Sequence, residues 1–173
     1  MIDSLILNND YIDFNSEIIY EIWESTIEGL TNPRQINVTT LNPADSINEN
    51  VGLLIGDLKT SEFVHVNNVF KNTYVEQVVD YIKDTTKFPI GRVRFLLVGH
   101  SSTYEHKCKK LELRLHIPIK TNNHCYYIVD GKCYTMPLRG RTYSVKTNES
   151  HTVLNANTHQ FRLHLVFETY TLV

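Results

Sequence analysis

The sequence predicts a mostly β protein, an antiparallel sandwich or barrel whose N-terminal helices pack on one sheet. Three observations favour this fold class. Helical spacing is confined to the part before residue 90, about seven short strand-like runs follow it, and turn residues separate these runs at short intervals. We therefore expect helices first and an antiparallel β core afterwards.

Length and composition indicate one domain with a substantial core. The chain has 173 residues, of which 42% are hydrophobic. We predict a single domain over 1–173, with a helical and loop-rich part over 1–89 and a β core carrying the site over 90–173. Three cysteines form neither an even set nor a C-x-x-C pair, which argues against a disulfide framework and a structural zinc site.

Charge and hydropathy exclude several classes of partner. The chain has 17 basic and 19 acidic side chains, a formal net charge of −2, so no strong field attracts nucleic acid or an anionic membrane. The apolar runs are too short for a membrane span, and the N-terminus lacks the pattern of a signal peptide. We expect a cytoplasmic protein with no nucleic-acid partner and no membrane partner.

Two stretches in the first part have the spacing of amphipathic helices. "NSEIIYEIWESTIEGL" places apolar side chains at roughly helical intervals after its start at Asn15. A second helix is predicted from Thr73, which has capping-box spacing with Glu76, and should end before Pro89. Between the helices, residues 31–50 are expected to form loops and one strand, "INVTT".

The strand-like runs of the second part are rich in β-branched and aromatic residues. In order they are "RVRFLLVG", "LELRLHIPI", "HCYYIVDG", "KCYTMPL", "RTYSVK", "HTVLNA" and "FRLHLVFETYTLV". Asp130 and Gly131, followed by Lys132, predict a hairpin turn between two of these strands.

Two of the strands, "RLHIPI" and "RLHLVF", place an arginine and a histidine two residues apart. Successive side chains of a strand point to opposite faces, so Arg114 shares a face with His116, and Arg162 shares one with His164. The apolar residues that alternate with Arg162 and His164 are expected beneath the helices. Arg162 and His164 should therefore point into the barrel mouth.

An inward-facing arginine needs an anion, because a buried unpaired charge costs several kcal/mol. One interpretation is a carboxylate of the protein, for which Glu105, Glu112 and Glu149 are near in the sequence. The other is the carboxylate of a ligand, which a guanidinium group can bind through two parallel hydrogen bonds.

Two further histidines suggest a metal site. His106 follows a turn-rich segment and His151 opens the run "HTVLNA", and two imidazoles on neighbouring strands can hold one face of an iron octahedron. The spacing leaves alternatives open, since the chain has eight histidines. A cupin-like metal enzyme or sugar-binding barrel using His116 and His164 is one alternative, although the adjacent arginines would weaken metal binding there.

The order of these residues resembles that of the aspartyl/asparaginyl β-hydroxylase family over roughly residues 73–170. The matching residues are Gly99, His106-Lys107-Cys108, the run from Arg114 to Ile119, Gly140, the run from His151 to Asn155, and the run from Phe161 to Leu165. The resemblance implies a double-stranded β-helix, a jelly-roll or cupin-like barrel. It also implies an oxygenase that depends on Fe(II) and 2-oxoglutarate.

The resemblance also implies roles for individual residues. His106 and His151 match the two iron-binding histidines of the family. Arg162, eleven residues after His151, matches the arginine that binds the distal carboxylate of 2-oxoglutarate. Arg114 and His116 match an R-x-H pair at the pocket for this cosubstrate.

The chain departs from the wider superfamily at Cys108, where most members have the acid of an H-x-D motif. Cys108 either ligates iron as a thiolate, or stands aside while water fills the position, or marks the loss of iron binding. We place it in the predicted metal site with His106 and His151. In the third case, the protein would be a degenerate, non-catalytic binding or scaffold domain.

By the same resemblance, the predicted activity is hydroxylation of an amino acid with dioxygen as co-reactant. The substrate would be an Asp- or Asn-type side chain in a protein or peptide, or a free amino acid such as proline. No separate catalytic side chain is predicted, because the metal and the cosubstrate supply the chemistry. Candidates at the mouth are His100, Ser101, Ser102, Tyr104, Arg139 and Arg141, whereas Tyr126, Tyr127, Tyr134 and Tyr143 are assigned to strand packing.

Overall fold

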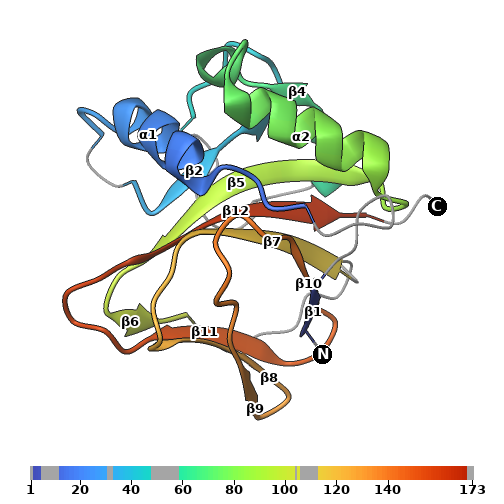
Figure 1. Ribbon diagram of the computed structural model, residues 1–173. Coiled ribbons are helices and arrows are strands. Elements are labelled where there is room, and N and C mark those ends of the chain that lie inside the picture. The colour runs from blue at the N-terminus through green and yellow to red at the C-terminus, as the bar shows by residue number, and fades with distance from the viewer. Residues whose placement is uncertain are drawn as a thin grey trace.

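Two antiparallel sheets face each other, and two helices cover the outer face of the larger sheet (Figure 1). The structure is a computed structural model that describes residues 2–4, 12–30, 33–47, 59–103, 105 and 113–170. This arrangement confirms the predicted class: a mostly β, jelly-roll or cupin-like barrel with helices packed on one sheet.

The larger sheet has six strands and the smaller sheet has four. In spatial order, the larger sheet contains β1 (Ile2–Ser4), β10 (Tyr143–Lys146), β7 (Leu113–Lys120), β12 (Arg162–Thr169), β5 (Ile90–Val98) and β2 (Gln35–Asn37). The smaller sheet contains β6 (Ser101–Ser102), β11 (His151–Asn155), β8 (Cys125–Val129) and β9 (Lys132–Tyr134). A separate pair is formed by β3 (Thr39–Thr40) and β4 (His65–Val66).

All seven predicted runs form strands, with ends shifted by a few residues. The predicted strand "INVTT" divides into β2 and β3, which belong to different sheets. Two strands of the larger sheet come from the chain before residue 90, since β1 pairs with β10 and β2 pairs with β5.

Helix α1 (Ser16–Thr26) begins as predicted, after Asn15. The Asn15 side chain accepts hydrogen bonds from the backbone N–H groups of Glu17 and Ile18 at 3.1 and 3.2 Å. These bonds satisfy two of the donors that the first turn of a helix leaves without intrahelical partners. Ile19 and Trp23 of this helix are buried against the larger sheet.

Helix α2 (Tyr74–Thr85) also ends before Pro89, but the predicted capping box is wrong. The Thr73 hydroxyl donates to the carbonyl of Phe70, at the end of the 3₁₀ turn η2 (Asn68–Phe70), at 2.6 Å. Glu76 accepts from the backbone N–H of Asn72 instead of Thr73. The preceding turn therefore takes both side chains away from the capping geometry.

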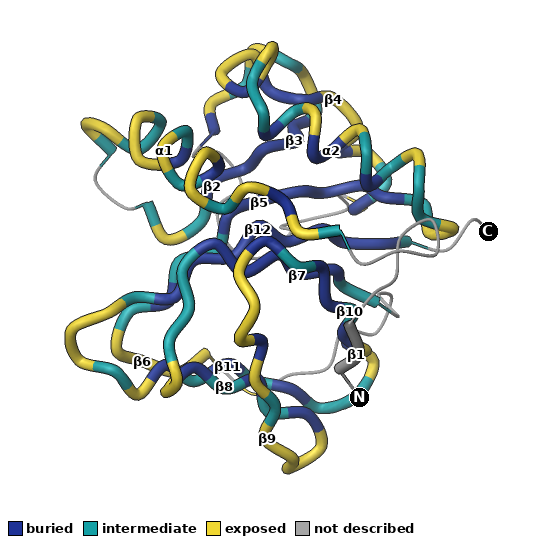
Figure 2. Tube along the Cα trace, viewed as in Figure 1, coloured by how far each residue is buried: buried dark blue, intermediate teal, exposed yellow. Residues whose placement is uncertain are grey.

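The main core lies between the helices and the larger sheet, and the middle strands of this sheet are buried along their length (Figure 2). Sheet residues in this core include Leu115, Ile117, Ile119, Leu163, Leu165 and Phe167, and helix residues include Val75, Val78, Val79 and Ile82. The prediction that the apolar face of "RLHLVF" lies beneath the helices is confirmed. Of the described helices, none is long and apolar enough to cross a membrane.

The predicted hairpin turn at Asp130 and Gly131 is confirmed between β8 and β9. Both residues have positive φ, 48° and 73°, and Val129 pairs directly with Lys132. Positive φ at both central positions is the conformation that matches the twist of a two-residue hairpin. β8 belongs to the smaller sheet, which faces the larger sheet (Figure 1).

Candidate active site

The inner face of the larger sheet carries a row of buried polar side chains. They are Arg92, Arg94, His116, Arg162, His164 and Glu168, together with the partly buried Arg114. They alternate with the core residues of β5, β7 and β12, so they point toward the smaller sheet. Their contacts divide them into two groups, one around Glu168 and one around Arg162.

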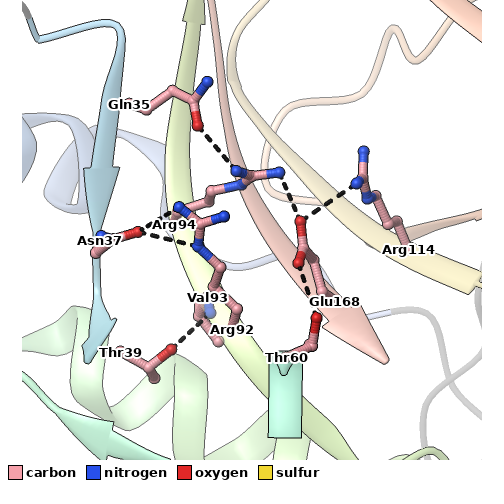
Figure 3. A network of polar contacts seen from close by, with 9 residues as sticks. All are labelled: Gln35, Asn37, Thr39, Thr60, Arg92, Val93, Arg94, Arg114 and Glu168. Carbon is pink, nitrogen blue, oxygen red and sulfur yellow. Dashed lines mark hydrogen bonds and ion pairs between the residues drawn. The ribbon is translucent and has the colours of Figure 1, made fainter. Parts of the chain in front are cut away.

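The Glu168 group is shown in Figure 3. Arg94 Nη2 donates to Glu168 Oε1 at 2.5 Å, and Arg114 Nη2 lies 3.3 Å from the same oxygen. The hydroxyl of Thr60, in the 3₁₀ turn η1 (Thr60–Glu62), donates to Oε2 at 3.4 Å. Burial disfavours the ionised carboxylate, but Arg94, Arg114 and Arg92 outweigh it and lower the pKa of Glu168.

The same group is tied to the edge strand β2. Arg92 donates through Nε and Nη2 to Asn37 Oδ1, both at 3.2 Å, and Arg94 donates to Gln35 at 2.8 Å. The guanidinium of Arg92 also lies 5.4 Å from the ring centre of Phe63. Burial lowers the pKa of Arg92. The Glu168 group therefore links β2, β5, β7, β12 and η1.

The carboxylate next to Arg114 is that of Glu168, which was not among the three acidic residues considered from the sequence. Glu105 instead accepts a hydrogen bond from the Ser150 hydroxyl at 2.5 Å, and Glu112 lies outside the described residues. Glu168 stands at even spacing from Arg162 and His164, so the alternation of the strand could have identified it. Arg114 lies on the same sheet face as Arg162, and its ion pair is with Glu168.

Arg162 begins β12 and has only 3% of its surface exposed. Its Nη2 donates to Nδ1 of His164 at 2.8 Å. Among the described residues, no carboxylate pairs with it. Burial lowers the pKa of Arg162 to about 10, which leaves the side chain a cation at neutral pH.

His116 and His164 lie beside this cation, with 2% and 1% of their surfaces exposed and ring centres 5.6 Å apart. Burial, followed by the charge of Arg162, places both pKa values well below the usual value, so both rings are neutral. Both nitrogens of His116 and Nε2 of His164 lack a hydrogen-bond partner within the described part of the chain. Buried polar atoms of this kind indicate a water or ligand that completes the site.

Tyr127 of β8 connects these histidines to His151 of β11. Its ring stacks on His151 at 5.9 Å between centres and meets His116 edge to face at 5.4 Å. Tyr127 is buried, in keeping with its predicted place in strand packing. It also links the two sheets, because a continuous chain of contacts runs from His151 through Tyr127 and His116 to His164 and Arg162.

His151 is buried and has a fixed ring orientation. Its Nδ1 lies 2.8 Å from the backbone oxygen of Glu149. A carbonyl only accepts, so Nδ1 carries a proton, as is common in histidines that bind a metal through Nε2. His106 and Cys108 lie outside the described residues, within which no group of three or more His, Cys, Asp or Glu is placed to hold a metal.

A pocket opens at Arg162, between the two sheets. Its lining residues are Thr121, Cys125, Tyr126, Tyr127, Met136, Arg162 and His164. The walls therefore combine apolar and aromatic surface with one buried cation and one histidine. Ligand-binding sites commonly combine apolar walls with a few placed polar groups in this way.

Asn155 joins the strand of His151 to the strand of Arg162. It is fully buried, and its amide donates to the carbonyl oxygens of Val98 and Gln160 at 3.2 and 2.8 Å. Val98 is the strand partner of Arg162, and Gln160 precedes Arg162 by two residues. Asn155 therefore fixes the backbone from which Arg162 enters the pocket.

The two arginines considered for substrate binding at the mouth are paired within the chain. Arg139 donates to Glu17 at 2.6 Å, and Arg141 donates to Asp13 at 2.8 and 2.9 Å. Gly140 between them has φ 79°, and a Cβ there would lie 2.0 Å from the backbone oxygen of Phe14. This turn anchors the segment before α1.

The two facing sheets, with an apolar outer core and a polar inner pocket, define the chain as a cupin-like barrel. The viral collagen prolyl hydroxylase vCPH from Paramecium Bursaria Chlorella virus-1 is similar over 97% of this chain and 93% of its own, with TM-score 0.55 and 10% identity. AviO1 from Streptomyces viridochromogenes Tue57 is similar over 94% and 89%, with TM-score 0.49 and 13% identity. A prolyl-4-hydroxylase from Pseudomonas putida is similar over 57% and 62%, with TM-score 0.40 and 15% identity.

The sequence model described as Aspartyl/Asparaginyl beta-hydroxylase matches residues 57–171. The chain belongs to this family, as its motifs predicted. No curated protein matches the chain.

Proposed function

We propose that the protein is an Fe(II)- and 2-oxoglutarate-dependent dioxygenase that hydroxylates an amino acid. The substrate would be an Asp- or Asn-type side chain in a protein or peptide, or a free amino acid such as proline. The observation that carries the proposal is the buried cation Arg162 in the inner pocket, which no carboxylate of the described residues neutralises.

The side chains that line the pocket suit the cosubstrate chemically. Arg162 and His164 line it, and Arg162 offers its remaining N–H groups to a carboxylate. A ligand anion would neutralise a charge whose burial alone is unfavourable by several kcal/mol. The apolar walls at Met136 and Tyr127 would cover the carbon chain of a small dicarboxylate.

His151 is the described residue that supports a metal site beside this pocket. His151 has the tautomer that a ligand histidine needs, and its ring is fixed by Glu149. We assign His106 as the second imidazole ligand and Cys108 as a thiolate ligand or as the neighbour of a water. When bound, Fe(II) and 2-oxoglutarate supply the oxidising chemistry with dioxygen.

The other side chains bind and orient. His116 is a neutral ring that can donate from one nitrogen and accept at the other, and both are buried beside Arg162. Arg114 is assigned to the cosubstrate pocket on the family motif. Arg114 Nη2 lies 3.3 Å from Glu168 Oε1, whereas Arg94 Nη2 lies 2.5 Å from the same oxygen. Glu168 would therefore keep Arg94 as its partner if Arg114 turned toward a ligand.

A second candidate function rests on Cys108, which stands where the wider superfamily has an acidic iron ligand. In this case the chain is a degenerate member of the fold that binds a dicarboxylate without oxidising it. Arg162 and His164 would then form a binding site alone. Succinate formation in the presence of dioxygen separates the two functions.

The test is an anaerobic titration of the protein with Fe(II) and 2-oxoglutarate, following the visible charge-transfer band of the chelated pair. We expect a band in the parent protein and its loss in His151→Ala and in Arg162→Ala. Arg139→Ala is the matched control, because Arg139 is exposed and pairs with Glu17 outside the pocket. A parent protein that shows neither a band nor binding of 2-oxoglutarate would refute the proposal.

A further inference from the structure

Cys125 is a nucleophilic side chain of the pocket that the proposed function does not use. It begins β8, is 5% exposed, and carries a free thiol. Cys125 lines the same pocket as Arg162 and His164. A thiol in the wall of an anion-binding pocket can change what that pocket binds.

The thiol has a defined position relative to Arg162. Cys125 Sγ donates to Asn155 Oδ1 at 3.5 Å. The amide nitrogen of the same asparagine donates to the carbonyl oxygens of Val98 and Gln160, at 3.2 and 2.8 Å. Val98 is the strand partner of Arg162. Asn155 therefore holds both the thiol and the backbone from which Arg162 enters the pocket.

An independent observation indicates that this pocket holds a small polar molecule. His164 is 1% exposed, and its Nε2 has no hydrogen-bond partner within the described part of the chain. A buried polar atom in a pocket wall indicates a water or ligand beside it. Hydrogen peroxide is little larger than water and forms hydrogen bonds of the same kind, so it can reach Cys125 where a bulky reagent cannot.

The charge of Arg162 favours a negative charge on the sulfur of Cys125. Burial lowers the pKa of Arg162 to about 10, and the electrostatic influences of Tyr127 and Cys125 act in the opposite direction. This attraction is mutual, so the guanidinium group stabilises an anion at Cys125. The thiolate is the form of cysteine that reacts with oxidants. Cys133, which is free and exposed on β9, provides a comparison outside the pocket.

We propose that Cys125 is a site of reversible oxidation by peroxide, and that its oxidised sulfur replaces the ligand carboxylate beside Arg162. The inference rests on the proposed function, since the ligand displaced is 2-oxoglutarate. The added oxygen occupies space in the pocket and accepts a hydrogen bond from the guanidinium group. Oxidation would thus close the pocket to dicarboxylates without unfolding the barrel.

The reaction with hydrogen peroxide is balanced. The sulfur of Cys125 attacks one peroxide oxygen, an S–O bond forms, and the O–O bond breaks. The second oxygen leaves as hydroxide and becomes water with the proton of the thiol. Sulfur loses two electrons, which the peroxide gains, and the product is the sulfenic acid. Two equivalents of a small thiol reverse the step, giving the cysteine, a disulfide of the small thiol and water.

The test compares the parent protein with Cys125→Ser, whose hydroxyl keeps a donor to Asn155. Both proteins are loaded with Zn(II), which is not redox-active, then treated with hydrogen peroxide and freed of it. Dimedone labelling and mass spectrometry locate the sulfenic acid, and calorimetry measures 2-oxoglutarate binding. We expect labelling at Cys125 and binding weakened about 10-fold or more in the parent, as for loss of a charge-assisted contact. Dithiothreitol should restore binding, and Cys125→Ser should bind equally before and after peroxide.

Protection by the ligand tests whether the oxidised thiol lies in the binding pocket. At about ten times its Kd, 2-oxoglutarate should slow the labelling of Cys125 about 10-fold, because the fraction of free pocket falls by that factor. Labelling of Cys133 should not change. Equal labelling of Cys125 with and without ligand would overturn the inference, as would a reduced Cys125 at peroxide concentrations that oxidise Cys133.

Two further outcomes also contradict the inference. Binding that weakens equally in the parent and in Cys125→Ser would place the effect at another cysteine. Loss of the far-ultraviolet circular dichroism on oxidation would show unfolding instead of a blocked pocket. The proposed function fails separately, since an untreated parent that binds no 2-oxoglutarate refutes it. A parent that binds 2-oxoglutarate equally with Cys125 reduced or oxidised refutes this inference alone.

Discussion

Replacing Glu168 with glutamine tests the buried charge group on the inner sheet face. Glu168 is 2% exposed, and its carboxylate contacts both Arg94 and Arg114. Glutamine has the same shape but removes the negative charge between the guanidinium groups. Removing one partner of a buried ion pair lowers the free energy of unfolding by about 3 to 5 kcal/mol.

Urea unfolding at pH 7 measures this loss, and thermal unfolding provides a second measure. For a chain of 150 to 250 residues, each kcal/mol shifts Tm by about 2 to 4 °C, so a decrease of about 6 to 20 °C is expected. Glu17→Gln is the control, because Glu17 is 55% exposed and pairs with Arg139 and Lys120 at the surface. Exposed pairs contribute about 1 kcal/mol or less.

The difference between parent and Glu168→Gln should depend on pH with a definite sign. The neighbouring arginines lower the pKa of Glu168 below its ordinary value of 4.5, so its carboxylate stabilises the fold above that pH. This stabilisation is lost as the pH falls through the lowered pKa, and the difference between the proteins should narrow on acidification. A loss below about 1 kcal/mol at pH 7, or a difference that widens in acid, would refute the reasoning.

Three further changes test other parts of the site. Asn155→Ala should lower the free energy of unfolding in urea by about 2 kcal/mol, because it leaves the buried carbonyl oxygen of Val98 and the partly buried carbonyl oxygen of Gln160 without their donor. Gly140→Ala should lower Tm more than Gly29→Ala: both glycines have positive φ, 79° and 81°, but only at Gly140 would a Cβ clash with Phe14. His116→Leu removes two buried nitrogens that have no hydrogen-bond partner among the described residues, so it should raise the free energy of unfolding of the ligand-free protein by about 1 kcal/mol. The same variant should weaken 2-oxoglutarate binding in the anaerobic titration.

Short-range patterns in the sequence predicted the features of the fold that depend on local backbone geometry. Alternation in "RLHLVF" placed Leu163 beneath the helices and Arg162 in the pocket, because strand periodicity fixes the face of each side chain. The turn at Asp130 and Gly131 was predicted for a similar reason, since few residue pairs adopt positive φ at both positions.

Pairings between distant strands were not predictable from these patterns. Glu168 contacts Arg114 because β12 and β7 pair in a register that places the two residues opposite each other. Tyr127 reaches His151 because β8 and β11 are neighbours in the smaller sheet. Register and sheet order depend on long-range packing, so the sequence indicated the inner face but not the groups formed on it.

The place of the short strand β2 and the true contacts of the predicted capping box were also not predictable from local patterns. β2 has three residues at the edge of the larger sheet, and its place beside β5 is set by contacts more than fifty residues away in the chain. Thr73 and Glu76 had the right spacing for a cap, but the preceding 3₁₀ turn offered competing hydrogen bonds. Spacing predicts an interaction only where no nearer partner competes.

The outer face of the larger sheet stabilises the fold, and its inner face carries the residues proposed to bind a ligand. The outer face, packed under α1 and α2, holds most of the buried hydrocarbon. Substitutions at Arg162, His164 or His116 leave that layer intact, so such variants should remain folded while their ligand preference changes. A family built on this sheet can diversify its chemistry from one side while the other side keeps the scaffold constant.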